Sequence, residues 1–242
     1  MPDVIEQESS MPARVIAPSP PTAEQVRAEV ASVPFWWHQI DLGRGVRTPG
    51  KVDPSKRLPR LGLPERLDGK SVLDIGAWDG FFSFECERRG AARVVAADRW
   101  DPTTGGAPSA GFDVAHRALG SRVEKFQSGV HRLTAQSPGR FDLVLFLGVL
   151  YHLEDPLGAL RAVRRVTAPG GVMILETLTD MLWTRRPCCA FYPGTEHRNE
   201  PTNWFAPNNA GLVGMCEAAG FSDVRIVWKL GLAGRAARAM GE

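Results

Sequence analysis

The chain has few cysteines and no long apolar run. It contains 4 cysteines among 242 residues, and none of them forms a C-x-x-C pair. Cys188 and Cys189 are adjacent and would strain to bridge each other, so the sequence predicts neither a disulfide framework nor a zinc cage. No stretch approaches the roughly 18 to 20 apolar residues of a membrane helix, and the start lacks the features of a secretion signal. We therefore expect a cytoplasmic protein with reduced thiols and no membrane partner.

A strong excess of positive charge is also missing. The formal net charge is +2, and the isoelectric point calculated from the sequence is near 8.4. A dedicated nucleic-acid binder usually has an isoelectric point above about 9 with clustered Lys and Arg. This comparison weakens an RNA substrate without excluding it.

Prolines and glycines divide the first third of the chain. Residues 1–22 hold five prolines and no apolar period, which predicts a disordered tail. The run TAEQVRAEVASV, which begins at Thr22, has a capping residue and valines at helical spacing, so a short amphipathic helix is expected there. Glycines and prolines interrupt the sequence that follows. We therefore interpret residues 23–68 as a helix and loop arm that covers the site.

Short apolar runs alternate with helical patterns from residue 69 onward. Strands are expected for SVLDI, RVVAA, RVEKF, DLVLFL, VMILE and DVRIVW, and helices over 80–89, 109–119, 156–167 and 208–219. This alternation predicts an α/β fold, a Rossmann-like and mostly parallel sheet with helices on both faces, over residues 69–242. Residues 177–207, after the fifth strand, are rich in aromatics and turn formers, and they are expected to form a lid.

The strongest motif is the strand and turn from Val72 to Gly80. A buried strand leads into a glycine turn that opens a helix, which brings backbone N–H groups to the sheet edge where open α/β sheets bind ligands. Gly76 allows a ligand to approach the backbone, and Gly80 allows the helix to pack closely. Asp74 is placed to fix the turn or to meet an ammonium group.

A second acidic residue completes the nucleoside signal. Asp98 ends the strand RVVAA, 24 residues after Asp74. A carboxylate at this place accepts hydrogen bonds from both hydroxyls of a ribose. The alternative is a tight turn with an unrelated surface Asp.

These residues resemble the class I S-adenosylmethionine-dependent methyltransferases. The sequence D-I-G-A-W-D-G stands where that family usually has D-x-G-x-G-x-G, with Trp78 in place of the middle glycine. An indole there suits a ligand without phosphates. The resemblance implies binding of S-adenosylmethionine, with S-adenosylhomocysteine as product. By the same resemblance, Trp78 and Asp79 join Asp74, Gly76 and Gly80 as cofactor residues of the turn. Arg99 or Trp100 is expected to cover one face of the adenine, with Gly129 and Val130 beside it. Leu147 and Gly148 are expected on the methionine side.

The region after the fourth strand suggests a subgroup. The run G-V-L-Y-H and the helix and strand after it resemble a bacterial group that includes the enzymes completing 5-oxyacetyl modification of the tRNA wobble uridine. The upstream WWHQIDLGRGVRTPGK and the downstream EHRNEPTNWFAPN are more similar to saccharide or secondary-metabolite O-methyltransferases. We therefore expect a small-molecule hydroxyl acceptor, with a tRNA enzyme or a non-catalytic binding module as alternatives.

His152 is the leading candidate for a general base. It follows the strand end that faces the methyl donor, and an unperturbed pKa of about 6.5 suits proton abstraction. The alternative is that it caps its helix or bonds to a backbone carbonyl. His197 is the second candidate, and Glu176 is placed to orient the acceptor or to cap its strand. The candidate acceptor contacts are Tyr151, Tyr192, Trp204 and His38. The last lies beside Trp36 and Trp37, and it is expected either to pack within this aromatic cluster or to lie at the mouth of the pocket.

Metal binding and assembly stay open at this point. His152-x-Glu154 and His197-x-x-Glu200 raise the question of a divalent metal, but the spacing of a closed metal site is missing, so metal dependence is not favoured. After DVRIVW the superfamily normally adds a seventh strand, whereas this chain continues as GLAGRAARAMGE. The sheet edge is then open, covered by this tail, or completed by a partner chain in a homodimer.

Overall fold

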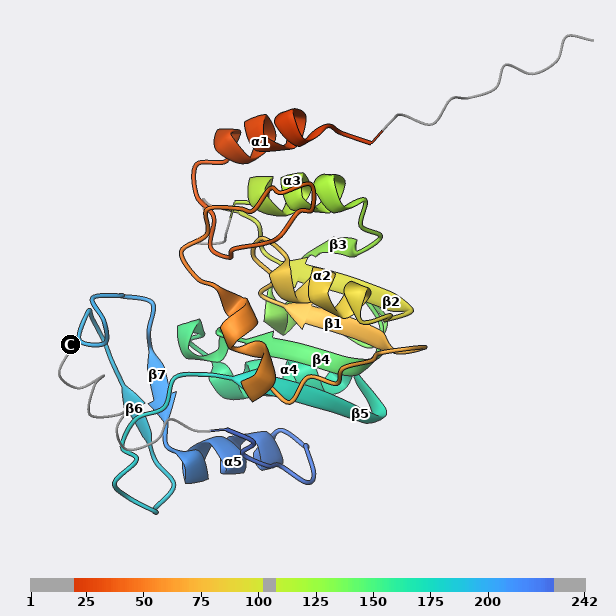
Figure 1. Cartoon of the computed structure of the whole chain (residues 1–242). Coiled ribbons are helices and arrows are strands. Elements are labelled where there is room, and N and C mark those ends of the chain that lie inside the picture. Colours follow the sequence, from red (N-terminus) through yellow and green to blue (C-terminus); the bar gives the residue numbers. More distant parts are fainter. Residues whose placement is uncertain (1–19, 102–107, 229–242) are drawn as a thin grey trace, which may run out of the picture.

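Five parallel strands form the centre of the protein in the computed structural model, which describes residues 20–101 and 108–228 (Figure 1). They are β1 (Ser71–Ile75), β2 (Arg93–Asp98), β3 (Glu124–Gln127), β4 (Phe141–Leu147) and β5 (Thr167–Glu176), in the order β3-β2-β1-β4-β5. The strand order reverses between β1 and β4. In open parallel sheets the crevice for ligands lies outside the carboxyl ends of the strands at this switch point.

The helices lie where the sequence predicts them, to within one residue at each end. They are α1 (Ala23–Ser32), α2 (Phe81–Arg88), α3 (Ala110–Leu119), α4 (Pro156–Val166) and α5 (Asn209–Ala218). Short 3-10 helices occupy loops of the described residues: η1 (Pro54–Lys56), η2 (Leu58–Arg60), η4 (Val130–Arg132) and η5 (Leu150–His152). None of the described helices is both long and apolar enough to cross a membrane.

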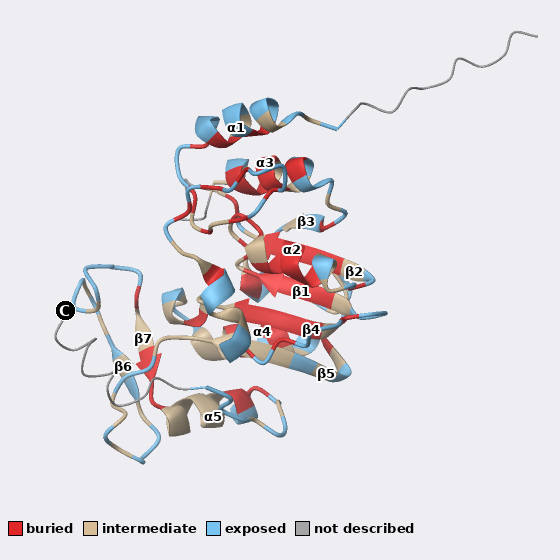
Figure 2. Cartoon of the chain, viewed as in Figure 1, coloured by how far each residue is buried: buried red, intermediate tan, exposed pale blue. Residues whose placement is uncertain are grey.

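The central strands β1, β2 and β4 are buried on both faces, whereas the edge strands β3 and β5 are more exposed (Figure 2). Leu143 and Leu145 of β4 pack into a core with α1, α2, α3 and the arm, while Val144 and Phe146 face a second core with α4 and α5. Successive side chains of a strand point to opposite faces, so a strand covered on both sides must be apolar throughout. The Rossmann-like α/β fold expected from the sequence is confirmed.

Residues 33–68 run from α1 back to β1 as an ordered arm. The capping box that Thr22 forms with Gln25 starts α1, and α1 packs against α3. The arm then folds onto itself: Val52 N–H donates to the Trp37 carbonyl at 2.8 Å, and Gln39 N–H donates to the Val52 carbonyl at 2.8 Å. These bonds give the loop a fixed shape without a regular sheet.

Residues 177–207, which we call the lid segment, leave the carboxyl end of β5. They contain the antiparallel pair β6 (Cys189–Phe191) and β7 (Phe205–Pro207), which is separate from the main sheet (Figure 1). The Trp204 N–H donates to the Tyr151 carbonyl at 2.8 Å, so the lid segment is joined to the loop after β4.

The predicted strand over residues 223–228 is wrong, because none of those residues is in a strand. Trp228 instead lies beneath the guanidinium of Arg60, 5.1 Å from the ring centroid, and Val227 lies beside Gly62. The segment therefore runs against the arm and does not pair with β5, which is the outer strand of the sheet among the described residues. Residues 1–19 of the predicted tail and the C-terminal GLAGRAARAMGE lie outside the described residues.

A matched pair of valines tests the two-faced sheet. Val144 is fully buried in β4 at 0% exposure, whereas Val172 in β5 is 57% exposed. Val144→Ala removes buried methyl groups and leaves a cavity, so it should lower the free energy of unfolding by about 2 kcal/mol. Val172→Ala should change it by less than about 0.5 kcal/mol. Urea denaturation of both variants checks this, and equal losses would contradict the burial described here.

Candidate active site

The turn after β1 requires glycine at two positions. Gly76 and Gly80 have positive φ angles of 76° and 90°. A Cβ on Gly76 would lie 2.3 Å from a Val149 methyl, and one on Gly80 would lie 2.6 Å from Phe84. Between them Trp78 keeps a left-handed φ of 53° although it carries a side chain. This turn therefore brings β1, α2 and the loop after β4 into close contact.

Asp98 binds the turn from the end of β2. One carboxylate oxygen accepts the Trp78 N–H at 2.9 Å, and the other accepts the Arg99 N–H at 2.6 Å. Burial raises the pKa of Asp98, while these backbone hydrogen bonds act against the rise. A carboxylate has about four acceptor positions, so acceptor capacity remains for further donors. The two sequence signals, the glycine turn and the acidic strand end, therefore meet in space.

Arg99 and Trp100 have different surroundings. Trp100 is only 7% exposed, its indole N–H donates to the Trp78 carbonyl at 2.9 Å, and its ring packs on Phe112. Arg99 is exposed, and its side chain runs beside Gly129. Of the two residues expected to cover an adenine, Arg99 is the accessible one, whereas Trp100 supports the turn.

Two further predicted cofactor residues, Asp74 and Val130, are buried. Ser83 of α2 donates its hydroxyl to Asp74 at 2.6 Å, so this acid is tied to the helix. Desolvation raises the pKa of Asp74 to about 6, against the hydrogen bond from Ser83. Val130 is buried in the core with α4 and α5, and its neighbour Gly129 is partly exposed.

Polar side chains gather at the ends of β4 and β5, and we call Tyr151, Glu176 and Arg57 the polar group. Gly148 N–H donates to the Glu176 carbonyl at 2.9 Å. A Cβ on Gly148 would lie 3.6 Å from the Tyr151 hydroxyl and 3.9 Å from the Glu176 carboxylate, so both groups flank this glycine. Arg57, from the arm, pairs with Glu176. Burial raises the pKa of the Tyr151 hydroxyl, and the negative charge of Glu176 adds to the rise. Leu147 is partly buried beside this group.

His152 has one ring nitrogen engaged by the lid segment. Its Nδ1 lies 3.0 Å from the Thr202 carbonyl and 2.9 Å from the Thr202 hydroxyl. Because a carbonyl only accepts hydrogen bonds, this contact favours the tautomer with a proton on Nδ1, which leaves Nε2 as the basic nitrogen. Desolvation lowers the pKa of His152, so the neutral ring predominates at pH 7. The carbonyl bond and a role as base are therefore compatible.

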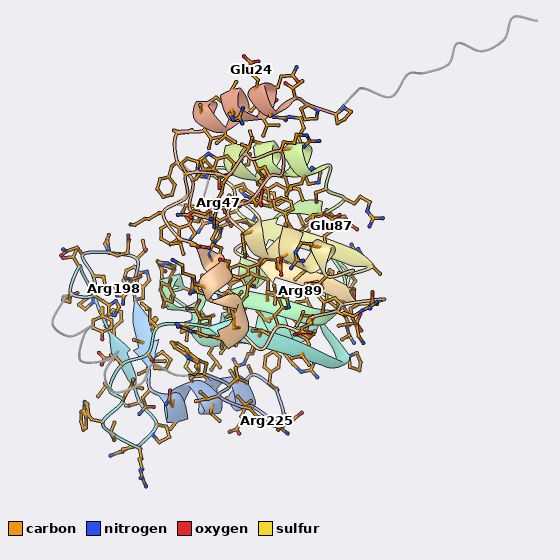
Figure 3. All side chains as sticks on the ribbon, in the orientation of Figure 1. Glu24, Arg47, Glu87, Arg89, Arg198 and Arg225 are labelled. Atoms are coloured by element: carbon orange, nitrogen blue, oxygen red, sulfur yellow. The ribbon has the colours of Figure 1, made fainter. Side chains whose placement is uncertain are left out.

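The other lid residues bond mainly within the lid segment. Asn203 donates to the His197 carbonyl at 3.1 Å, and the Tyr192 ring lies 5.0 Å from the His197 ring. Tyr192 also donates its hydroxyl to Asp180. Of the predicted lid contacts, Trp204 is the one joined to Tyr151. Figure 3 shows Arg198 of this segment and Arg47 of the arm on the side of the sheet where the strands end.

Sequence reasoning missed Arg57, Thr177 and Asn203. Thr177 and Asn203 each carry a buried side-chain oxygen without a hydrogen-bond partner, and they adjoin Glu176 and Trp204. Buried oxygens of this kind need a donor, so they are candidates to receive one from an acceptor molecule. Only Thr177 follows a predicted strand end closely enough for the sequence to have indicated it.

Of the two positions considered for His38, the structure has the packed one, and the residue does not lie at the mouth of a pocket. His38 is 5% exposed, and its Nδ1 pairs with Asp79 of the turn. Asp79 is itself buried and binds the arm, because two oxygens of a desolvated carboxylate must find donors. Within residues 20–101 and 108–228, no three His, Cys, Asp or Glu side chains converge as a metal site would require.

Comparison with known proteins gives a consistent family. The sequence matches the family described as Methyltransferase domain over residues 49–226. It is 30% identical over 169 residues to a tRNA U34 carboxymethyltransferase of Chromohalobacter salexigens, covering 66% of this chain and 47% of that protein. It is 39% identical over 113 residues to a ubiquinone biosynthesis O-methyltransferase of Azotobacter vinelandii, covering 47% and 46% of the two chains. The chain thus spans about half the length of the curated relatives it matches.

A solved structure shares the fold. The N-terminal domain of EvdMO1, determined with S-adenosylhomocysteine (SAH) bound, superposes with a TM-score of 0.58 at 22% identity, covering 82% of this chain and 86% of that one.

The raised pKa of Asp74 predicts a pH dependence of stability. A carboxyl group whose pKa is higher in the folded state stabilises the fold at low pH, and this contribution is lost as the pH rises through the folded value of about 6. Asp74→Asn should therefore remove a loss of roughly 3 kcal/mol in the free energy of unfolding between pH 4 and pH 7. Denaturant titrations across this range measure it.

Asp142 provides the control. Hydrogen bonds from Ser71 lower the pKa of Asp142, so its contribution is lost only at pH values below about 4. Asp142→Asn should leave the slope between pH 4 and pH 7 unchanged. An Asp74→Asn slope identical to that of the unmodified protein would show that Asp74 ionises normally.

Proposed function

The chain belongs to the class I S-adenosylmethionine-dependent methyltransferases, and we propose that it transfers the methyl group of S-adenosylmethionine to a hydroxyl of a small-molecule acceptor, a saccharide or another natural product. The single observation that carries this proposal is the junction of Trp78 with Asp98 at the switch point of the sheet. The proposal is supported because this junction joins a glycine turn, the start of α2 and an acidic strand end at the sheet edge where open parallel sheets bind their ligands.

The residues fit the proposed cofactor. Asp98 keeps acceptor positions for the ribose hydroxyls, and Arg99 and Gly129 lie together where an adenine would be covered. Leu147 and Gly148, at the end of β4, are assigned to the methionine side. When bound, S-adenosylmethionine supplies a methyl group on a positively charged sulfur.

The acceptor is assigned to the polar group at the ends of β4 and β5. Holding an acceptor close to the methyl group and in line with it lowers the activation free energy by up to about 7 to 11 kcal/mol. Glu176, Tyr151 and Arg57 orient its hydroxyls, and His152 Nε2 takes the proton from the hydroxyl that is methylated. Two observations favour this class of acceptor: the polar character of the group, and the O-methyltransferase among the relatives.

The lid segment contributes two features to the acceptor side of the proposed site. Thr202 fixes the tautomer of His152, and Trp204 holds the loop that carries Tyr151. We assign His197, Tyr192 and Trp204 to the wall around the acceptor.

A tRNA acceptor is the second candidate, because the relative from Chromohalobacter salexigens is a tRNA enzyme. Binding of tRNA should then weaken steeply with salt, since phosphate contacts release counterions. Filter binding at two salt concentrations, together with transfer of labelled methyl groups to bulk tRNA, tests this candidate. Absence of tRNA retention at low salt would exclude it.

Cofactor binding is tested with SAH by calorimetry. Asp98→Asn should weaken binding roughly 10-fold or more, because a charged acceptor of the ribose hydroxyls is lost. Asp142 lies near the start of β4, at the opposite end of that strand from Leu147. The variant Asp142→Asn should bind SAH as the unmodified protein does. If the unmodified protein gives no heat of binding with SAH, the proposed function is wrong.

The role of His152 is tested by His152→Gln. Loss of a placed general base should lower kcat about 10²- to 10⁴-fold while leaving SAH affinity unchanged. His131, whose ring also lies near a backbone carbonyl, provides the control variant His131→Gln, which should keep full activity. D-Fucose and other sugars are suitable first acceptors, since EvdMO1 was also crystallised in the presence of D-fucose.

The same assay has a pH signature. Because desolvation lowers the pKa of His152, the rate should rise with pH with a midpoint below the usual pKa of about 6.5. The rise should be absent from His152→Gln. Unchanged turnover in His152→Gln would remove this residue as the base.

A further inference from the structure

One buried carboxylate binds the arm to the turn after β1. Asp79 accepts the N–H groups of Trp37 and His38, both at 2.8 Å on the same oxygen. Its other oxygen pairs with His38 Nδ1. Three donors from two consecutive residues of the arm therefore converge on one side chain. Asp79 is 1% exposed, so water does not compete for these bonds.

The bound arm residues also meet the turn through their rings. The Trp37 ring lies 5.7 Å from the Trp78 ring between centroids, and the Phe35 ring lies 6.2 Å from it in an edge-on arrangement. Trp78 is the residue whose N–H is held by Asp98. The arm therefore covers the side chain of the same residue whose backbone Asp98 fixes.

The arm backbone at His38 is itself tightly supported. A Cβ on Gly50 would lie 2.0 Å from the His38 carbonyl carbon, so the returning loop passes directly against it. The Thr48 hydroxyl donates to the His38 carbonyl at 2.6 Å, and Lys51 N–H donates to the Trp36 carbonyl at 3.2 Å. Because these contacts stiffen the loop, the position of the whole loop depends on where His38 is held.

We propose that Asp79 and His38 are positioning residues that latch the arm onto the turn, so that Trp37 and Phe35 form part of the wall of the cofactor site. This inference rests on the proposed function, because the turn is the assigned site of S-adenosylmethionine. Asp79 is buried against the arm and contacts no reacting atom. It acts through the arm, which keeps the Trp78 ring packed and the left-handed turn in one conformation.

A second contact between arm and domain provides a matched control. Glu29 of α1 pairs with Arg117 of α3 at 2.8 Å, on the surface and remote from the turn. Glu29→Gln therefore weakens attachment of the same segment without touching the latch. Exposed pairs of this kind contribute little to stability.

The test compares Asp79→Asn with Glu29→Gln. Asp79→Asn keeps the size of the side chain but places a charge-free amide against three donors, so the arm should detach from the turn. We expect SAH to bind Asp79→Asn at least 10-fold more weakly, and KM for S-adenosylmethionine to rise more than kcat falls. Trypsin should also cut after Lys51 faster than in the unmodified protein, and SAH should protect that bond less. Glu29→Gln should match the unmodified protein in all of these measurements.

Trp37→Leu separates the ring from the latch. It keeps the backbone N–H that Asp79 accepts, so cleavage after Lys51 should stay slow while SAH affinity falls several-fold. This variant also carries the test if Asp79→Asn does not fold. Thermal unfolding of each variant without ligand identifies that case.

The outcomes separate this proposal from the proposed function. If the unmodified protein binds SAH and both Asp79→Asn and Trp37→Leu bind it equally well, the latch is wrong and the proposed function stands. If the unmodified protein does not bind SAH, both are wrong. Faster cleavage after Lys51 confined to Asp79→Asn, together with weaker SAH binding in both Asp79→Asn and Trp37→Leu, supports the latch.

Discussion

The structure depends on the attachment of the turn after β1 to the end of β2. Asp98 accepts the Trp78 N–H, and the Ala97 carbonyl accepts the Gly76 N–H at 2.8 Å. Hydrogen bonds between the two strands would align β1 with β2, but they would not fix the turn that follows β1. The bonds from Trp78 and Gly76 fix it, and they do so at the reversal of strand order, the place where open parallel sheets bind their ligands. The position of each other candidate residue is defined relative to this turn.

The arm links the two halves of the site. At one end of the arm, Asp79 holds Trp37 and His38 against the turn. At the other end, Arg57 pairs with Glu176 in the polar group, which is the proposed acceptor subsite. A segment with little regular secondary structure therefore contributes to both proposed subsites. Its order comes from hydrogen bonds within the arm and from those to the buried Asp79, because a carboxylate must find donors when water is excluded.

Three acids lie around the turn, and each accepts hydrogen bonds from different donors. Asp79 is matched by three donors, Asp98 by backbone N–H groups, and Asp74 by the Ser83 hydroxyl. Desolvation raises the pKa of Asp74 and of Asp98 despite these bonds. Concentrating buried carboxyls at one place opposes folding at neutral pH, and perturbed carboxyls of this kind are typical of functional sites.

The sequence by itself determined the family, the α/β sheet and the helix bounds, and it indicated that the glycine turn meets Asp98. These features depend on hydrophobic periodicity and turn residues, which involve positions close together in the chain. It did not determine what the strand-like run at 223–228 packs against, since pairing depends on which edge is within reach. Nor did it place His38 under Asp79 or Arg57 against Glu176. Those contacts join residues 41 and 119 positions apart, and only the folded chain brings them together.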